Sequence, residues 1–168
     1  MEWASLLRQA GPDCSNLRIH SMVAIELVTP EKQCITAPSS HDVLNALARI
    51  HQSDPGQPLV IIASRDDDKG PVDKLELARL NNCESGVPDG WLLRHVRSNE
   101  KHSHVLAASN SGNDAFERRE LFGAFEDIRA VCILSDELVK ERVLSFVATG
   151  ACDHNWIWLD FRDSVRSA

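Results

Sequence analysis

The sequence predicts an α+β fold: a single domain with an antiparallel sheet and helices packed on one face of it. Three observations predict this fold. Short apolar runs typical of strands follow one another along the chain, helical spacing of apolar residues occurs near each end, and no repeat or linker interrupts the 168 residues. We expect one domain over residues 1–168, with an N-terminal arm at 1–20 and a frayed tail at 162–168.

The first third of the chain predicts two strands and a helix. Residues 22–28 are apolar or β-branched except for Glu26, and residues 34–36 can return beside them after a turn. Ser39 or Ser40 can cap a helix, and Asp42 favours its first turn. The apolar positions of this helix recur at helical spacing at Val43, Leu47 and Ile50.

The middle of the chain predicts further strands. Residues 59–63 form a continuous apolar run, which suits a strand that is buried on both faces. Leu75 and Leu77 alternate with charged residues, as in a half-buried strand. Residues 81–90 are rich in Asn, Gly, Pro and Asp and indicate a loop. Two more apolar stretches, 91–96 and 104–108, indicate two further strands.

The segment 115–134 is ambiguous. Leu121, Phe125 and Ile128 have helical spacing, whereas residues 130–134 resemble a strand. The next element is clear, because Ser135 can cap a helix that Gly150 is placed to end. Its apolar stripe consists of Val139, Val143, Phe146 and Val147.

Residues 156–161 predict the last strand. Alternation places Trp156 and Trp158 on one face, and it places Ile157, Leu159 and Phe161 on the other. Because both faces are apolar, we expect a central or covered strand here.

Charge and composition restrict the function. The net charge of −7 argues against general phosphate binding and favours a basic partner. The excess lies in two windows: residues 64–90 carry seven acidic and four basic side chains, and residues 114–141 carry eight and four. These windows fit either an acidic docking surface for a basic protein or solvated loops.

Targeting and cysteine patterns indicate a cytoplasmic protein. The N-terminus lacks the basic start and apolar run of a secretory signal, and no apolar run is long enough for a membrane span. The five cysteines are odd in number and contain no pair at two-residue spacing, so we expect reduced thiols and no zinc ribbon.

Candidate catalytic and metal-binding residues form no strong motif. Cys152-Asp153-His154 has the chemistry of an activated thiol, yet a nucleophile and its base rarely lie two residues apart. His102 and His104 alternate and would need a third metal ligand such as His95. We therefore expect no catalytic residue, no metal and no cofactor.

Two other patterns fail as binding motifs. The run Asp66-Asp67-Asp68 lacks the glutamate of a calcium loop, because the twelfth position is Leu77. The stretch 91–97 mixes an aromatic residue with basic ones, but its surroundings are too acidic for single-stranded nucleic acid.

The C-terminal pattern resembles the first-numbered family of polymorphic-toxin immunity proteins. The pattern is Ile133-Leu134-Ser135-Asp136-Glu137, a helix that ends in Phe146 and Thr149-Gly150, and a strand with Trp156 and Trp158. The family often has a proline before the tryptophan, which residues 151–155 lack. The resemblance implies a non-catalytic protein that binds and neutralises a toxin domain, commonly a nuclease or a nucleobase deaminase.

A basic toxin domain would be steered by acidic loops. We expect part of the docking surface at Asp66, Asp67, Asp68, Glu84 and Asp89, with Trp91 as an aromatic anchor if it is exposed. The next candidates are Glu117, Glu120, Glu126 and Asp127. Two alternatives remain: a small enzyme that depends on cysteine or histidine, and a self-associating interaction module.

Overall fold

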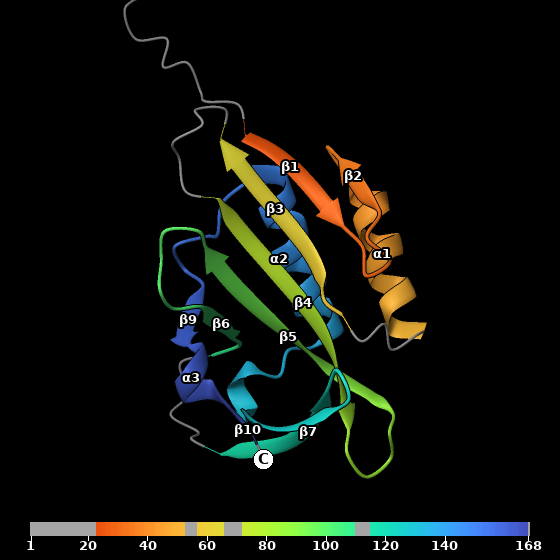
Figure 1. Cartoon of the computed structure of the whole chain (residues 1–168), viewed down its shortest axis with the longest axis vertical. Coiled ribbons are helices and arrows are strands. Elements are labelled where there is room, and N and C mark those ends of the chain that lie inside the picture. The colour runs from red at the N-terminus through yellow and green to blue at the C-terminus, as the bar shows by residue number, and fades with distance from the viewer. Residues whose placement is uncertain (1–22, 53–56, 66–71, 110–114, 168) are drawn as a thin grey trace, which may run out of the picture.

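The computed structural model describes residues 23–52, 57–65, 72–109 and 115–167, and its sheet is antiparallel throughout this part of the chain (Figure 1). The strands are β1 Val23–Val28, β2 Cys34–Thr36, β3 Leu59–Arg65, β4 Asp73–Asn82, β5 Pro88–Arg97, β6 His104–Ala107, β7 Phe116–Leu121, β8 Ala124–Arg129, β9 Ile157–Asp160 and β10 Val165–Ser167. The helices are α1 Ser40–Gln52, the 3-10 turn η1 Ala130–Cys132, α2 Asp136–Thr149 and α3 Phe161–Ser164.

The long strand β4 organises the sheet. Its first half pairs with β3, which continues to β1 and β2. Its other edge pairs with β5, and from there the sheet continues to β6 and β9. The last residues of β4, Asn81 and Asn82, pair with β7, which leads to β8 and β10 at the lower end of Figure 1. The branch that begins with β3 and the branch that begins with β7 therefore start from opposite halves of one edge of β4, and β5 pairs with the other edge.

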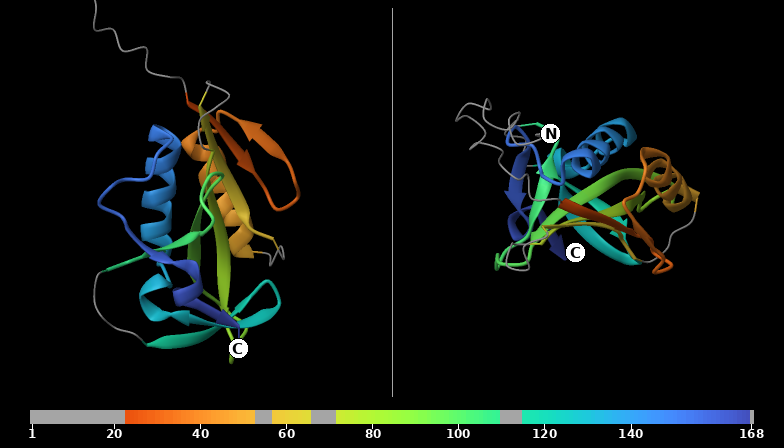
Figure 2. Two further views of the ribbon diagram at one scale, coloured as in Figure 1. Left: turned by 60° about the vertical axis from the view of Figure 1, so that its left-hand side comes forward. Right: turned by 90° about the horizontal axis from the view of Figure 1, so that it is seen from above.

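The helices α1 and α2 lie next to each other and share one hydrophobic core with the sheet (Figure 2). This core includes Val43 and Leu47 of α1, Val143 and Phe146 of α2, and fully buried leucines of the sheet such as Leu77. Burial of each of these side chains contributes about 1.5–3 kcal/mol. No helix in the described part of the chain has the length and apolarity that crossing a bilayer requires.

A second core lies between the β5–β6 part of the sheet and the β7–β8–β10 part. It contains Leu80 of β4, Ile128 of β8, Cys132 of η1 and Val165 of β10, and Phe161 of α3 packs against it. The expectation that helices pack on one face is therefore not met by α3.

Local signals begin both long helices, and end α2, as the sequence predicts. Ser39 precedes α1 and exchanges hydrogen bonds with Asp42: its backbone N–H donates to the carboxylate at 2.9 Å, and its Oγ accepts from the backbone N–H of Asp42 at 3.2 Å. Ser135 caps α2 by accepting from the Leu138 N–H. Gly150 ends α2 with φ 66°, where a Cβ would lie 2.4 Å from Val23 Cγ1.

The ambiguous segment forms a hairpin followed by η1. Phe122 and Gly123, at φ 53° and 79°, make the two-residue turn between β7 and β8. Such a turn matches the twist of paired strands, which explains why the helical spacing of nearby apolar residues does not produce a helix. The strand expected at 130–134 is wrong, because Ala130–Cys132 is a 3-10 turn.

Three other strand predictions need correction. β3 alternates between buried residues and the half-buried Val60 and Ile62, so one of its faces is only partly covered. The loop expected at 81–90 is shorter, because β4 extends to Asn82 and β5 begins at Pro88. β9 pairs only with β6 among the described residues, so it is an edge strand and not a central one, but it is covered on both faces: Trp158 packs against the first core, and Ile157 and Leu159 pack against the second.

The C-terminal tail is ordered rather than frayed. After α3, Val165 pairs with Ile128 of β8 and is only 9% exposed, and Ser164 is fully buried. The tail therefore closes the second core. The predicted N-terminal arm at 1–20 lies outside the described residues.

Candidate functional site

A cluster of three side chains joins the start of α2 to the middle of the sheet. The Asp136 carboxylate accepts a hydrogen bond from the Trp91 indole at 2.6 Å and forms an ion pair with Arg79. The Arg79 guanidinium lies 4.8 Å from the centre of the Trp91 ring. Two backbone hydrogen bonds between Trp91 and Leu134, at 2.9 and 3.0 Å, hold β5 close to the start of α2, because Leu134 directly precedes the capping residue Ser135.

Two hollows of the surface meet at Asp136. The first, which we call the acidic groove, has a volume of about 380 Å³. It is lined by Arg79, Pro88, Asp89, Gly90, Ile133, Leu134, Ser135, Asp136 and Glu137. Gly90 is required here, since its φ is 94° and an added Cβ would lie 2.5 Å from Ile133. The β4–β5 hairpin can therefore approach the start of α2 closely.

The second hollow, which we call the apolar slot, lies between α1 and α2 and has a volume of about 490 Å³. Leu44, Leu47 and Ala48 of α1 and Val139 and Lys140 of α2 line it, together with Trp91 and Asp136. The slot and the acidic groove thus share one carboxylate.

The two acidic windows of the sequence come together at the acidic groove. Asp89 belongs to the first window, and Asp136 and Glu137 belong to the second. Arg119 links the windows a second time, because its guanidinium lies 3.3 Å from Asp89 and 2.5 Å from Glu117. Among the residues that line the groove, three are acidic and one, Arg79, is basic, so the groove carries an excess of negative charge.

The predicted interface residues differ in their placement. Glu84 and Asp89 are exposed on the hairpin between β4 and β5. Trp91 is only 3% exposed, so it is not available as a surface anchor and instead lines the inner side of the apolar slot. The run Asp66-Asp67-Asp68 lies outside the described residues.

The second set of predicted acidic residues lies on β7 and β8. Glu117 is exposed, whereas Glu120, Glu126 and Asp127 are half-buried. Asp127 accepts a hydrogen bond from Arg118 at 3.1 Å, so part of this charge is neutralised locally.

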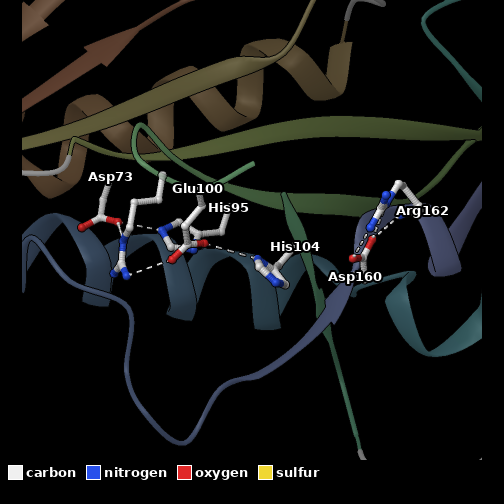
Figure 3. A network of polar contacts seen from close by, with 7 residues as sticks. Asp73, His95, Glu100, His104, Asp160 and Arg162 are labelled. Atoms are coloured by element: carbon white, nitrogen blue, oxygen red, sulfur yellow. Dashed lines mark hydrogen bonds and ion pairs between the residues drawn. The ribbon is translucent and has the colours of Figure 1, made fainter. Parts of the chain in front are cut away.

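A third hollow, of about 380 Å³, gathers histidines near the C-terminal end of β5, and we call it the histidine hollow. It is lined by His95, Arg97, Glu100, His104, Cys152, Asp153, His154, Trp156 and Trp158. Figure 3 shows Asp73, His95, Glu100 and His104 in a row along the sheet. Asp73 lies 2.9 Å from both the His95 Nε2 and the Arg97 Nε, and Glu100 lies between Arg97 and His104 at 3.2 and 3.8 Å.

The thiol in the histidine hollow is not activated. Burial, reinforced by the negative charge of Asp73, raises the pKa of Cys152 to about 12. A thiol with this pKa stays protonated at neutral pH and is a weak nucleophile. The predicted partner His154 is almost fully exposed and lies 3.4 Å from Asp153, which supports the turn by accepting from the Asn155 N–H.

The structure also gathers no metal ligands where the sequence suggested them. His95 is bonded to Asp73, His104 faces Glu100, and His102 is exposed in the preceding turn. In the part of the chain that the structure describes, no three His, Cys, Asp or Glu side chains are arranged to hold a metal ion.

Sequence reasoning missed the roles of Arg79 and Leu44. Arg79 stands between Ala78 and Leu80 in an apolar stretch of strand, and a cation in that position needs a buried partner. That signal was available, but the partner is Asp136, which lies 57 positions away. Leu44 lies beside the buried face of α1 and is 37% exposed.

Comparison with known proteins gives no family for this chain. No family model, curated protein or solved structure matches it.

Proposed function

We propose that this chain is a cytoplasmic immunity protein that neutralises a basic toxin domain by binding to it, without catalysis of its own. The observation that carries the proposal is the convergence of the two acidic windows at one groove beside an apolar slot. The resemblance of the C-terminal pattern to immunity proteins supports the same function. The toxin would act on nucleic acid, as a nuclease or a deaminase, because such enzymes need a basic surface.

The arrangement of charge suits recognition of a basic protein. Asp89 is 54% exposed although it pairs with Arg119, and Glu137 is exposed at the start of α2, so both carboxylates are accessible to a cation of the partner. Long-range attraction between net charges of opposite sign speeds association, and it acts over about 8–10 Å at physiological salt. The groove would then supply the local carboxylates that orient the partner.

An enzyme that depends on Cys152 is less well supported. Its thiol has a pKa near 12, and the carboxylate of Asp73 contributes to that rise. His95, which lines the same hollow, already has its Nε2 bonded to Asp73. The histidine hollow therefore lacks the thiolate that nucleophilic catalysis requires.

The direct test uses the toxin domain encoded beside the gene for this chain. We expect the two purified proteins to form a stable complex in size-exclusion chromatography, and we expect co-expression to protect cells from the toxin. A neighbouring toxin domain that neither binds nor is neutralised would contradict the proposal. Glu141→Gln, on the exposed side of α2, removes a carboxylate outside the groove and serves as a control for changes in the groove.

A further inference from the structure

On the basis of the proposed function, we infer that the apolar slot between α1 and α2 receives an apolar side chain of the basic partner, with a lysine or arginine next to it in the partner's chain that binds in the acidic groove. The slot would then be the anchor point of the complex, and the groove would select the charge beside it.

The walls of the slot suit an apolar occupant. Leu47 and Val139 are nearly fully buried, whereas Leu44, on the preceding turn of α1, is 37% exposed. The apolar face of α1 therefore continues past the core to the surface. A volume of about 490 Å³ leaves room for a side chain such as leucine or phenylalanine.

The inner side of the slot is fixed before the partner arrives. Trp91 is held by its bond to Asp136 and by Arg79 over its ring. Its backbone N–H and C=O groups both form hydrogen bonds with the backbone of Leu134. Binding would therefore cost little reordering of the indole, which favours an anchor at this place.

The carboxylates beside the slot indicate that its occupant belongs to a basic chain, and they indicate on which side of the slot the basic residue lies. Asp136 lines both the slot and the groove, and Glu137 and Asp89 line the groove beyond it. A cation next to the anchored side chain would meet these carboxylates on the groove side. Lys140 lines the slot from α2 and would repel a cation placed next to it. The partner's basic residue is therefore expected over the groove.

A pair of synthetic peptides tests this inference without the toxin. The probes are acetylated and amidated Lys-Lys-Leu-Lys-Lys and the same peptide with serine in place of leucine. The indole N–H resonance of Trp91 reports on the slot, and those of Trp156 and Trp158 are internal controls. We expect the leucine peptide to shift the Trp91 resonance saturably and the serine peptide to bind about tenfold more weakly or worse. Equal binding of both peptides, or no shift at about 5 mM of the leucine peptide, would overturn the inference.

Variants of α1 separate the slot from general charge attraction. Ala48→Phe fills the slot and Leu44→Ser removes an apolar wall, while Asn45→Phe adds an aromatic ring to an exposed position of α1 that does not line the slot. We expect Ala48→Phe and Leu44→Ser to weaken the affinity for the leucine peptide about tenfold, and we expect Asn45→Phe to leave it unchanged. With the toxin domain, a complex that forms equally well with Ala48→Phe would reject the slot but keep the proposed function. Peptide binding in the slot without any toxin complex would keep the slot and reject the function.

Discussion

The Asp136 carboxylate lies 2.6 Å from the Trp91 indole nitrogen and so ties the first residue of α2 to the centre of β5. The same carboxylate neutralises Arg79, whose side chain is only 9% exposed. One side chain therefore shapes both hollows of the candidate site and compensates a cation that is mostly buried.

We predict that Asp136→Ala destabilises the fold by about 1–3 kcal/mol, because the Arg79 guanidinium and the Trp91 N–H both lose their acceptor. Urea unfolding measures this. Glu137→Ala is the matched control, since it removes an exposed charge from the same first turn and should change stability by less than about 0.5 kcal/mol. Equal effects of the two changes would mean that only the helix dipole is involved.

Trp156 and Trp158 are predicted to differ in their contribution to stability. The two rings lie 6.0 Å apart, but Trp156 is 6% exposed whereas Trp158 is half-buried on the edge strand β9. Trp156→Ala should cost about 3–5 kcal/mol, and Trp158→Ala should cost less. Thermal unfolding gives the comparison, and a Trp156→Ala protein as stable as the wild type would show that its burial adds nothing.

The raised pKa of Cys152 predicts both slow chemistry and alkaline instability. The ordinary thiol pKa is 9.0, and the folded protein raises it to about 12. Cys152 should react with iodoacetamide far more slowly at pH 8 than the exposed Cys34.

The stability effect has a definite sign. Between about pH 9 and 12 the unfolded chain loses the Cys152 proton while the folded chain keeps it, so the free energy of unfolding should fall as the pH rises. A Cys152→Ala protein should lose less stability over this range than the wild type. Identical pH profiles of the two proteins would show that the thiol pKa is not raised on folding.

The C-terminal tail is predicted to stabilise the second core. Val165 packs with Ile128, so Val165→Ala should lower the free energy of unfolding by about 1–3 kcal/mol. Ser167→Ala, at an exposed position of the same strand, should have little effect. If the valine variant unfolds at the same urea concentration as the serine variant, the tail does not close the core.

Local signals account for the elements that the sequence predicts well. The cap at Ser135 and the left-handed Gly150 lie at the two ends of α2, and the apolar run that begins at Leu59 gives β3. These signals act between residues a few positions apart. The sequence therefore defines both long helices and most of the strands.

Pairing between distant segments accounts for what the sequence does not show. Phe125 has helical spacing with Leu121 and Ile128 in a segment that the sequence leaves ambiguous, but its strand pairs with β7 and leaves it 56% exposed. The candidate site also depends on contacts between distant segments, because Arg79, Asp89 and Asp136 come from three separate elements. The two acidic windows of the sequence indicate where acidic side chains are concentrated, but only the folded chain shows that the windows meet at one groove.

The most direct test of the central claim is the salt dependence of association with the toxin domain. Asp89→Asn combined with Glu137→Gln removes two carboxylates from the acidic groove, and Glu141→Gln removes one from outside it. In stopped-flow measurements at low salt, the account predicts that the double variant associates about tenfold more slowly than the wild type and shows a weaker dependence on salt, whereas Glu141→Gln stays close to the wild type. An unchanged association rate of the double variant at low salt would contradict docking at the acidic groove.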